Sequence, residues 1–360
     1  MIYLSKKDDN LEKKPKKKMN VVLKIFLILF ISIIIIVLIA ATAGYFYIKN
    51  KLGKIDYVDL PKSEITINEG VTKTLTTYRN IALLGLDARS NTFGTGNRSD
   101  CIMILSLNEQ TNDVKIVSVY RDTYLNIDGH GLDKVTHAYS YGGPKLALNT
   151  LNQNLDLNIT EFVAINFDTV RTVVDSVNGI EMTLDSQEIK YINGYINALN
   201  KQFHTSSKNI TSPGTYTLDG VQALAFSRIR YTEGGDHKRT ERMRDVLTAV
   251  FNKAKTLNVG QLNNLADTIL PQVSTNINEK EILNMIPKIA TVNVIDNFGW
   301  PYETKGATIN KVWYGAPIDL ADNVSRLHKN LFGTENYEPT DTVKSISENI
   351  IKKTGYKKEN

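Results

Sequence analysis

The feature that most constrains this 360-residue chain is a run of 24 residues without a charge at positions 25–48. About 20 apolar residues in a helix span the hydrocarbon core of a bilayer, so this run is long enough to cross a membrane with some tilt. Tyr45, Phe46 and Tyr47 lie at its far end, where aromatic rings favour the level of the lipid headgroups. The sequence therefore predicts a transmembrane helix within residues 21–48.

The charges around this run predict its orientation. Residues 1–54 contain eleven lysines and three acidic residues, and eight of the lysines precede the apolar run. Because the cytoplasmic flank of a membrane helix carries the excess of positive charge, we expect residues 1–20 in the cytoplasm and residues 49–360 outside the cell. The alternative is a cleaved signal peptide, since Ala-Thr-Ala at 41–43 resembles a cleavage site, but the run is longer than the about 7–15 apolar residues of such peptides.

Composition excludes several classes of protein. The chain beyond residue 54 has a net charge of −3, which is unlike a nucleic-acid-binding domain with its positive field. A single cysteine, Cys101, excludes an internal disulfide and a cysteine-based zinc site, and its apolar surroundings predict a buried, unreactive thiol. The sequence contains no G-x-S-x-G, H-E-x-x-H or P-loop motif, so serine-hydrolase, zinc-protease and P-loop functions have no support.

Apolar runs alternate with helical patterns along the outer part. Strands are expected at 64–67, 80–86, 101–107, 114–119, 162–166 and 180–184. Helices are expected at 144–155, 168–177 with Asp168 as its cap, 219–226, 236–258, 279–290 and 319–332. This interleaving predicts an α/β fold in which helices flank a central sheet.

Arginines carry the clearest chemical signal, because the chain has 32 lysines and only 11 arginines. Five of them fall within seventeen residues, namely Arg228, Arg230, Arg239, Arg242 and Arg244. Three more adjoin an aspartate, in the pairs Asp87 with Arg89, Arg98 with Asp100, and Arg121 with Asp122. A guanidinium binds phosphate oxygens bidentately, so the clustering predicts phosphate recognition, helped by the helix start near Asp236. The alternative is a set of surface arginines that pair with nearby acids.

Asp87 and Asp100 form a second candidate site. Asp87 follows one expected strand and Asp100 precedes the next, so their carboxylates are expected to meet at one edge of the sheet. Two carboxylates with room for substrate phosphates suit Mg²⁺, which keeps most of its waters. The alternative is a pair of carboxylates that cap the loop between the strands.

Five segments resemble the LytR-CpsA-Psr family, the extracytoplasmic enzymes of Gram-positive cell walls. They are NIALLGLDAR (80–89), NRSDCIMILSLN (97–108), VSVYRDTYLNIDGHGLDKVTHAYSYGG (117–143), VAINFDTVRTVVDSVNGIEMTL (163–184) and LDGVQALAFSRIRYTEGGDHKRTERMRDVL (218–247). The resemblance implies a mixed central β-sheet between two layers of helices, carried by one N-terminal membrane anchor. The expected division is a leader at 1–20, an anchor at 21–48, a linker at 49–74, a catalytic domain at 75–335 and a loosely held polar tail at 336–360.

The resemblance also implies an activity. Family members transfer a teichoic acid, capsule or other wall glycan from a polyprenyl-pyrophosphate carrier to peptidoglycan and form a phosphodiester. By position, Asp87 and Asp100 match the family's Mg²⁺ ligands, with Mn²⁺ as the alternative ion. The residues that match its catalytic and pyrophosphate-binding positions are Arg98, Arg121, Asp122, Arg228, Arg230, Asp236, Arg239 and Arg242, with Lys134 and Arg89 as weaker matches.

Some positions differ from the family's usual pattern. Tyr120, Cys101 and Met243 replace the usual proline, threonine and glutamine. Apolar residues such as Met243, Val246 and Val250 are candidates to line a groove for the prenyl tail, or else pack in the core. Two other functions stay open: a hydrolase of the same carrier, and a non-catalytic binder or regulator of wall precursors. Direct transcriptional control is disfavoured, because a cytoplasmic part of about 20 residues is too short for a DNA-binding domain.

Overall fold

The computed structural model describes residues 44, 46–88, 92–289 and 291–358. The chain divides into two compact units, residues 1–50 and 51–360. The predicted leader and most of the predicted membrane helix lie outside the described residues. Within the described ranges, no helix has the length and apolar character needed to span a bilayer.

The second unit is built on a mixed seven-stranded sheet with the strand order β1-β10-β7-β2-β3-β4-β11. These strands are β1 (Asp56–Tyr57), β2 (Tyr78–Leu86), β3 (Ser99–Asn108), β4 (Asp113–Val119), β7 (Glu161–Asn166), β10 (Val273–Thr275) and β11 (Asn293–Trp300). Strands β2, β3 and β4 pair antiparallel in sequence order, while β7 joins β2 and β11 joins β4 in parallel. The predicted α/β fold with a mixed central sheet is confirmed.

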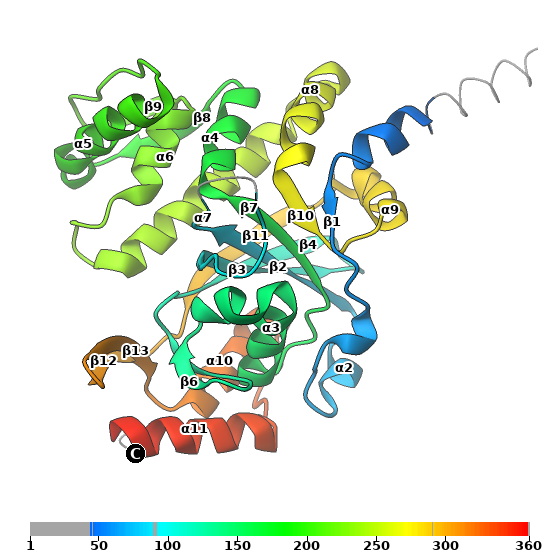
Figure 1. The fold of residues 1–360 in the computed structure, drawn as a ribbon, viewed down its shortest axis with the longest axis vertical. Helices are drawn as coiled ribbons and strands as arrows, with labels where there is room; N and C mark the ends of the chain where they lie inside the picture. Colours follow the sequence, from blue (N-terminus) through cyan, green and yellow to red (C-terminus); the bar gives the residue numbers. More distant parts are fainter. Residues whose placement is uncertain (1–43, 45, 89–91, 290, 359–360) are drawn as a thin grey trace, which may run out of the picture. The chain divides into compact units, whose positions relative to one another are not determined.

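Helices cover both faces of this sheet (Figure 1). One face carries α3 (His137–Leu155), α10 (Leu320–Phe332) and α11 (Asp341–Thr354), and the other carries α4 (Phe167–Ser176), α6 (Gly220–Arg228) and α7 (Gly235–Ala254). Successive side chains of a strand point to opposite faces. Leu84 and Ile102 therefore join the core around α3 and α10, whereas Leu83 and Met103 face α4 and α7.

The remaining elements surround these layers. They are α2 (Val71–Thr74), the hairpin β5 (Tyr124–Ile127) and β6 (Gly131–Lys134), the pair β8 (Ile180–Leu184) and β9 (Gly214–Leu218), α5 (Ser186–Phe203), α8 (Val259–Ile269), α9 (Glu279–Ile289), the hairpin β12 (Thr304–Ile309) and β13 (Val312–Pro317), and two short 3-10 helices, Lys62–Glu64 and Leu270–Gln272. Helix α5, with a capping box at Asp185, was not expected from the sequence. The expected strand at 64–67 is wrong, because a 3-10 turn ends there at Glu64.

Two helix caps illustrate how local sequence sets the boundaries. Asp219 accepts from the backbone N–H of Gln222 and begins α6, as expected. The cap of α4 is Asn166 and not Asp168, because the Asn166 side chain accepts from Thr169 N–H at 2.8 Å. The helix therefore starts directly after β7, which places Phe167 beside the end of the sheet.

The C-terminal segment is an integral part of the domain, which corrects the expectation of a loosely held tail. Helix α11 buries Val343, Ile346 and Ile350 against the core around α3 and α10. Asp156 accepts hydrogen bonds from the backbone N–H and the hydroxyl of Thr340, at 2.8 and 2.7 Å. The segment is rich in lysine, but its apolar residues recur at helical spacing and form one buried face.

Replacement of a buried residue of α11 therefore destabilises the whole domain. We expect Ile350→Ala to lower the free energy of unfolding by about 2–5 kcal/mol, because it removes a fully buried side chain. Glu348→Ala on the exposed face of the same helix is the control and is expected to change it by less than about 0.5 kcal/mol. Urea denaturation measures both, and equal stability of the two variants would show that α11 contributes little.

Candidate active site

The predicted aspartates meet at one end of the sheet. Leu86, the last residue of β2, pairs with Ser99, the first residue of β3. Asp87 and Asp100 directly follow these two residues, and the backbone N–H of Asp87 donates to the carbonyl of Arg98 at 2.9 Å. The antiparallel pairing of two neighbouring strands thus brings the backbones of both residues to the same end of the sheet.

Arg121, which follows β4, lies among three carboxylates. Its Nη1 donates to Asp100 Oδ2 at 2.7 Å, and its Nε lies 3.5 Å from Oδ2 of both Asp122 and Asp236. Burial disfavours the charge of this guanidinium, but Asp100, Asp236 and Asp122 outweigh it and raise the pKa of Arg121 above its usual value. Arg121 is therefore a permanent cation with a fixed orientation.

Arg239 approaches the same carboxylates from the first turns of α7. Its Nη1 lies 3.4 Å from Asp236 Oδ1, while its buried Nε has no hydrogen-bond partner within the described chain. Burial, followed by the nearby Arg230, lowers the pKa of Arg239 below its usual value. A buried guanidinium with an unused donor favours the arrival of an anion. We call Arg121, Arg239, Asp100, Asp122 and Asp236 the charged cluster.

Three further arginines are linked to this cluster by a series of charge interactions. Arg98 lies 3.7 Å from Asp87, and Arg230 Nε lies 4.0 Å from Asp236; both side chains are about half exposed. Arg228 ends α6, where burial lowers the pKa of its guanidinium and the charges of Asp168 and Asp87 partly oppose that shift. The structure therefore brings these arginines to one region, whereas Arg89 lies outside the described residues.

Arg242 occupies a different environment. Its side chain is 1% exposed, and its Nε donates to Glu188 Oε1 at 2.9 Å. It also donates to the hydroxyl of Thr232 at 2.9 Å and to the carbonyl of Ile229 at 3.3 Å. These contacts connect α7 to α5 and to the loop that carries Arg230. The structure therefore assigns Arg242 a positioning role and does not bring it into the charged cluster.

A small cleft opens beside the charged cluster. It is lined by Tyr120, Asp122, Thr123, Asp236, His237, Thr304, Trp313 and Gly315. Lys134 Nζ lies 2.7 Å from Asp122 Oδ1 and holds that carboxylate. The rings of Tyr120 and His237 stack with their centroids 3.9 Å apart, so Tyr120 forms part of the wall of the cleft.

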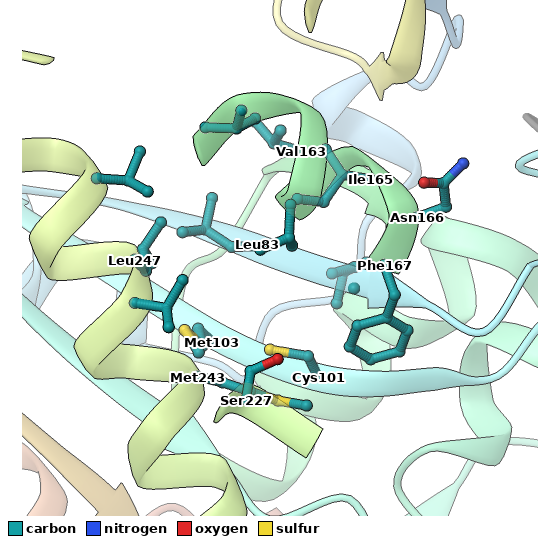
Figure 2. A pocket seen from close by; sticks show the side chains of 16 residues that line it. Leu83, Cys101, Met103, Val163, Ile165, Asn166, Phe167, Ser227, Met243 and Leu247 are labelled. Atoms are coloured by element: carbon teal, nitrogen blue, oxygen red, sulfur yellow. The ribbon is translucent and has the colours of Figure 1, made fainter. Parts of the chain in front are cut away.

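An apolar cavity of about 210 Å³, whose lining is shown in Figure 2, adjoins the charged cluster where Phe167 meets Arg239. It lies between β2, β3 and β7 and the helices α4 and α7, and it includes the predicted residues Met243, Val246 and Val250. Phe167 lines the cavity, and the guanidinium carbon of Arg239 lies 5.9 Å from the centre of its ring. The hydrocarbon lining therefore ends where the charges begin.

Cys101 and Gly85 shape the floor of this cavity. A Cβ atom on Gly85 would lie 2.8 Å from Cys101 Cβ, so only glycine permits this approach of β2 and β3. Burial raises the pKa of the Cys101 thiol to about 12, which supports the expectation of an unreactive cysteine. Met243, which replaces the usual glutamine of the family, faces the cavity and contributes apolar surface (Figure 2).

The donor set restricts the metal that this site can hold. Among the described residues, no group of three or more histidine, cysteine, aspartate or glutamate side chains is placed to hold an ion. Asp87 and Asp100 supply two hard carboxylates, and the side chain of Asp87 is 56% exposed with one ion-pair contact at 3.7 Å. This set fits an ion such as Mg²⁺ that takes its other ligands from water and phosphate.

Sequence reasoning missed three residues of the site. Phe167 and His237 are ordinary residues of helix starts, and only the structure places them at the cavity and the cleft. Trp313 lies on the β12–β13 hairpin, whose two-residue turn is formed by Asn310 and Lys311. Both residues have positive φ, as such a turn requires, and the asparagine was the sequence signal for it.

Matched substitutions distinguish the buried arginine from an exposed one. We expect Arg242→Met to lower the free energy of unfolding by about 3–5 kcal/mol, because it leaves Glu188 buried without its partner. Arg230→Met should change stability by less than about 0.5 kcal/mol, since its side chain is half exposed. Thermal and urea unfolding measure both variants, and a stable Arg242→Met protein would contradict the assigned positioning role.

Known proteins provide an independent comparison. The family described as LytR_cpsA_psr matches residues 44–329. The polyisoprenyl-teichoic acid–peptidoglycan teichoic acid transferase TagT of Bacillus subtilis (strain 168) is 33% identical over 232 residues, 63% of this chain and 69% of that protein. The crystal structure of B. subtilis TagT superposes with a TM-score of 0.56 at 26% identity, covering 78% of this chain and 100% of that one. A structure of the family protein YwtF (TagT) with bound octaprenyl pyrophosphate lipid shares the fold, with a TM-score of 0.51 at 22% identity over 83% of this chain and 99% of that one. The chain therefore belongs to the LytR-CpsA-Psr family.

Proposed function

We propose that this protein transfers a phosphate-linked glycan from a polyprenyl-pyrophosphate carrier to peptidoglycan, with a phosphodiester as the product. The glycan is a teichoic acid, a capsule or another secondary wall polymer. The observation that carries this proposal is the junction at Phe167, where an apolar cavity of about 210 Å³ meets Arg239. A ligand that fits this junction has a hydrocarbon chain joined directly to an anion.

Binding follows from the two halves of the junction. The prenyl chain lies in the cavity, where each buried methylene contributes about 0.8 kcal/mol. The pyrophosphate lies on Arg239 and Arg121, and Arg98, Arg228 and Arg230 surround it. The unused Nε donor of Arg239 and the permanent charge of Arg121 support this placement.

Catalysis depends mainly on charge stabilisation. Attack on a pyrophosphate spreads negative charge over the phosphate oxygens, and cations that are already oriented stabilise this charge without reorganisation. Arg121 is such a cation, because three carboxylates fix its position. Arg239 lies beside the cavity and stabilises the departing polyprenyl phosphate.

A carboxylate of the cluster accepts the proton of the acceptor hydroxyl. Asp122 lines the cleft, and Lys134 orients it at 2.7 Å. Asp100 is not among the residues that line the cleft. We therefore assign the role of general base to Asp122.

Asp87 and Asp100 would hold the Mg²⁺ or Mn²⁺ ion. When bound, such an ion neutralises charge on the phosphate oxygens. Asp87 belongs to this pair because its exposed carboxylate lies on the same strand end as Asp100. The excess of lysines before the apolar run further supports a single-pass protein with residues 1–20 in the cytoplasm and the catalytic domain outside the membrane.

The decisive experiment follows the glycan. Full-length protein in detergent is mixed with Mg²⁺, a polyprenyl-pyrophosphate donor with a labelled glycan, and uncrosslinked peptidoglycan oligomers. We expect the label to appear on the oligomers. Arg121→Ala and Asp100→Ala should each lower the rate of transfer about a hundredfold to a thousandfold. Arg326→Ala, which removes a half-exposed ion pair with Glu303, is the control and should keep the wild-type rate.

Other outcomes assign other functions. Release of free glycan phosphate with no labelled oligomer would identify a hydrolase. Tight donor binding that needs no Mg²⁺ and yields no product would identify a binder. Full turnover by Arg121→Ala would remove the proposed site, provided that its circular dichroism spectrum matches that of the wild type.

The cavity leads to a separate prediction about the affinity for the prenyl chain. Val250→Trp places a large ring in the cavity, so we expect its affinity for a long-chain polyprenyl pyrophosphate to fall about tenfold or more, since two displaced methylenes already account for that factor. Asn252→Trp introduces the same ring at an exposed position of α7, on the neighbouring groove, and serves as the control. Affinity for inorganic pyrophosphate should not change in either variant. Equal lipid affinity in both would place the chain elsewhere.

A further inference from the structure

Trp313 is an exposed aromatic residue with a fixed position. Its exposed fraction is 51%, whereas Trp300, the only other tryptophan of the chain, is fully buried. Gly306 of the β12–β13 hairpin leaves room for its indole, because a Cβ there would lie 2.8 Å from Nε1, whereas a Cβ on Gly315 would make an ordinary contact at 3.9 Å from Cη2. The ring therefore rests on bare backbone and presents its remaining surface to solvent.

The same hairpin is attached to the proposed general base. The backbone N–H of Gly315 donates to the carbonyl of Asp122 at 2.9 Å, and Gly315 also pairs with Thr123. Lys134 Nζ, which holds the Asp122 carboxylate, lies 6.0 Å from the centre of the Trp313 ring. Trp313 and Asp122 thus line one cleft at a fixed separation.

Contacts connect the charged cluster both to this cleft and to the apolar cavity. One series of contacts leads from Phe167 in the cavity through Arg239 to Asp236 in the cleft. Another leads from Asp100, next to Cys101 in the cavity wall, through Arg121 to Asp122. A phosphate bound to the cluster is therefore within reach of both the cavity and the cleft.

This arrangement identifies the ligand of the cleft if the proposed function holds. In phosphoryl transfer, the attacking and leaving oxygens lie roughly in line on opposite sides of the phosphorus. The leaving polyprenyl phosphate occupies the cavity side, so the attacking hydroxyl enters through the cleft. The ligand of the cleft is then the acceptor, and the donor glycan departs to the side of this line.

We propose that Trp313 binds a pyranose ring of the acceptor glycan strand by stacking and directs its hydroxyl toward Asp122. The C–H face of a sugar packs on the electron-rich face of an indole, while the polar rim of the sugar reaches the carboxylates of the cleft. The hydroxyl oxygen attacks the phosphorus that carries the glycan, its proton passes to Asp122, and the bond to polyprenyl phosphate breaks. Trp313 is thus an acceptor-binding residue.

Intrinsic fluorescence tests the contact without any turnover. A soluble, uncrosslinked oligomer of alternating N-acetylglucosamine and N-acetylmuramic acid is added to full-length protein in detergent, with no donor present. We expect a saturable change in emission that Trp313→Phe abolishes, because the remaining Trp300 is buried. An unchanged wild-type spectrum at oligomer concentrations that saturate transfer would overturn the proposal.

Kinetics then identify which substrate the ring binds. We expect Trp313→Ala to raise the KM for the acceptor about tenfold and to leave the KM for the donor within about twofold, with most of the loss recovered by Trp313→Phe. Val312→Ala, on the adjacent exposed residue whose side chain points to the other face of the strand, is the control and should change neither constant.

The contrary results are distinct. A higher KM for the donor in Trp313→Ala would place the donor glycan on the ring and overturn the assignment to the acceptor. Unchanged constants for both substrates would remove Trp313 from the binding site. If the wild type forms no product with any acceptor, the proposed function fails, whereas the fluorescence response still decides whether the indole binds this saccharide.

Discussion

The interaction on which the site depends is the contact of one guanidinium with three carboxylates. Arg121 follows β4, Asp100 lies in β3 and Asp236 begins α7, so a single side chain connects the sheet to the helix that covers it. Partial burial strengthens these attractions and also makes an unmatched charge costly. The charged cluster contains three carboxylates and two guanidinium groups. Arg98, Arg228 and Arg230 supply three more positive charges, which together favour the binding of an anion.

Side chains alternate along β2 and β3, so one set stabilises the core and the other set lines the cavity. Residues such as Leu84 and Ile102 complete a dense core with α3 and α10, which stabilises the domain. Their neighbours Leu83 and Met103 face α4 and α7, where the packing leaves a cavity. Because the two sets occupy opposite faces of the same strands, the cavity exists without weakening the main core.

Much of the fold was predictable, because strands β2, β3, β4 and β7 and helices α6, α7 and α10 have strong periodic patterns, and α6 and α10 also begin at recognisable caps. Helix α11 was missed because its lysines conceal the stripe of Val343, Ile346 and Ile350. Convergence of arginines with aspartates was also predictable, since both types cluster at strand ends in the sequence. The role of Arg242 was not, because its partner Glu188 lies 54 residues away, on a helix that the sequence pattern did not reveal.

The direct transition from Phe167 to Arg239 has a consequence for discrimination among diphosphates. Water-soluble sugar nucleotides present the same pair of phosphates, yet a ribose and a base are too polar for walls of leucine, isoleucine and valine. Such a molecule can bind the arginines but leaves the apolar cavity empty. It therefore lacks the free energy that a lipid gains when its hydrocarbon chain is buried. The apolar lining of the described cavity therefore favours lipid-linked diphosphates over water-soluble activated sugars.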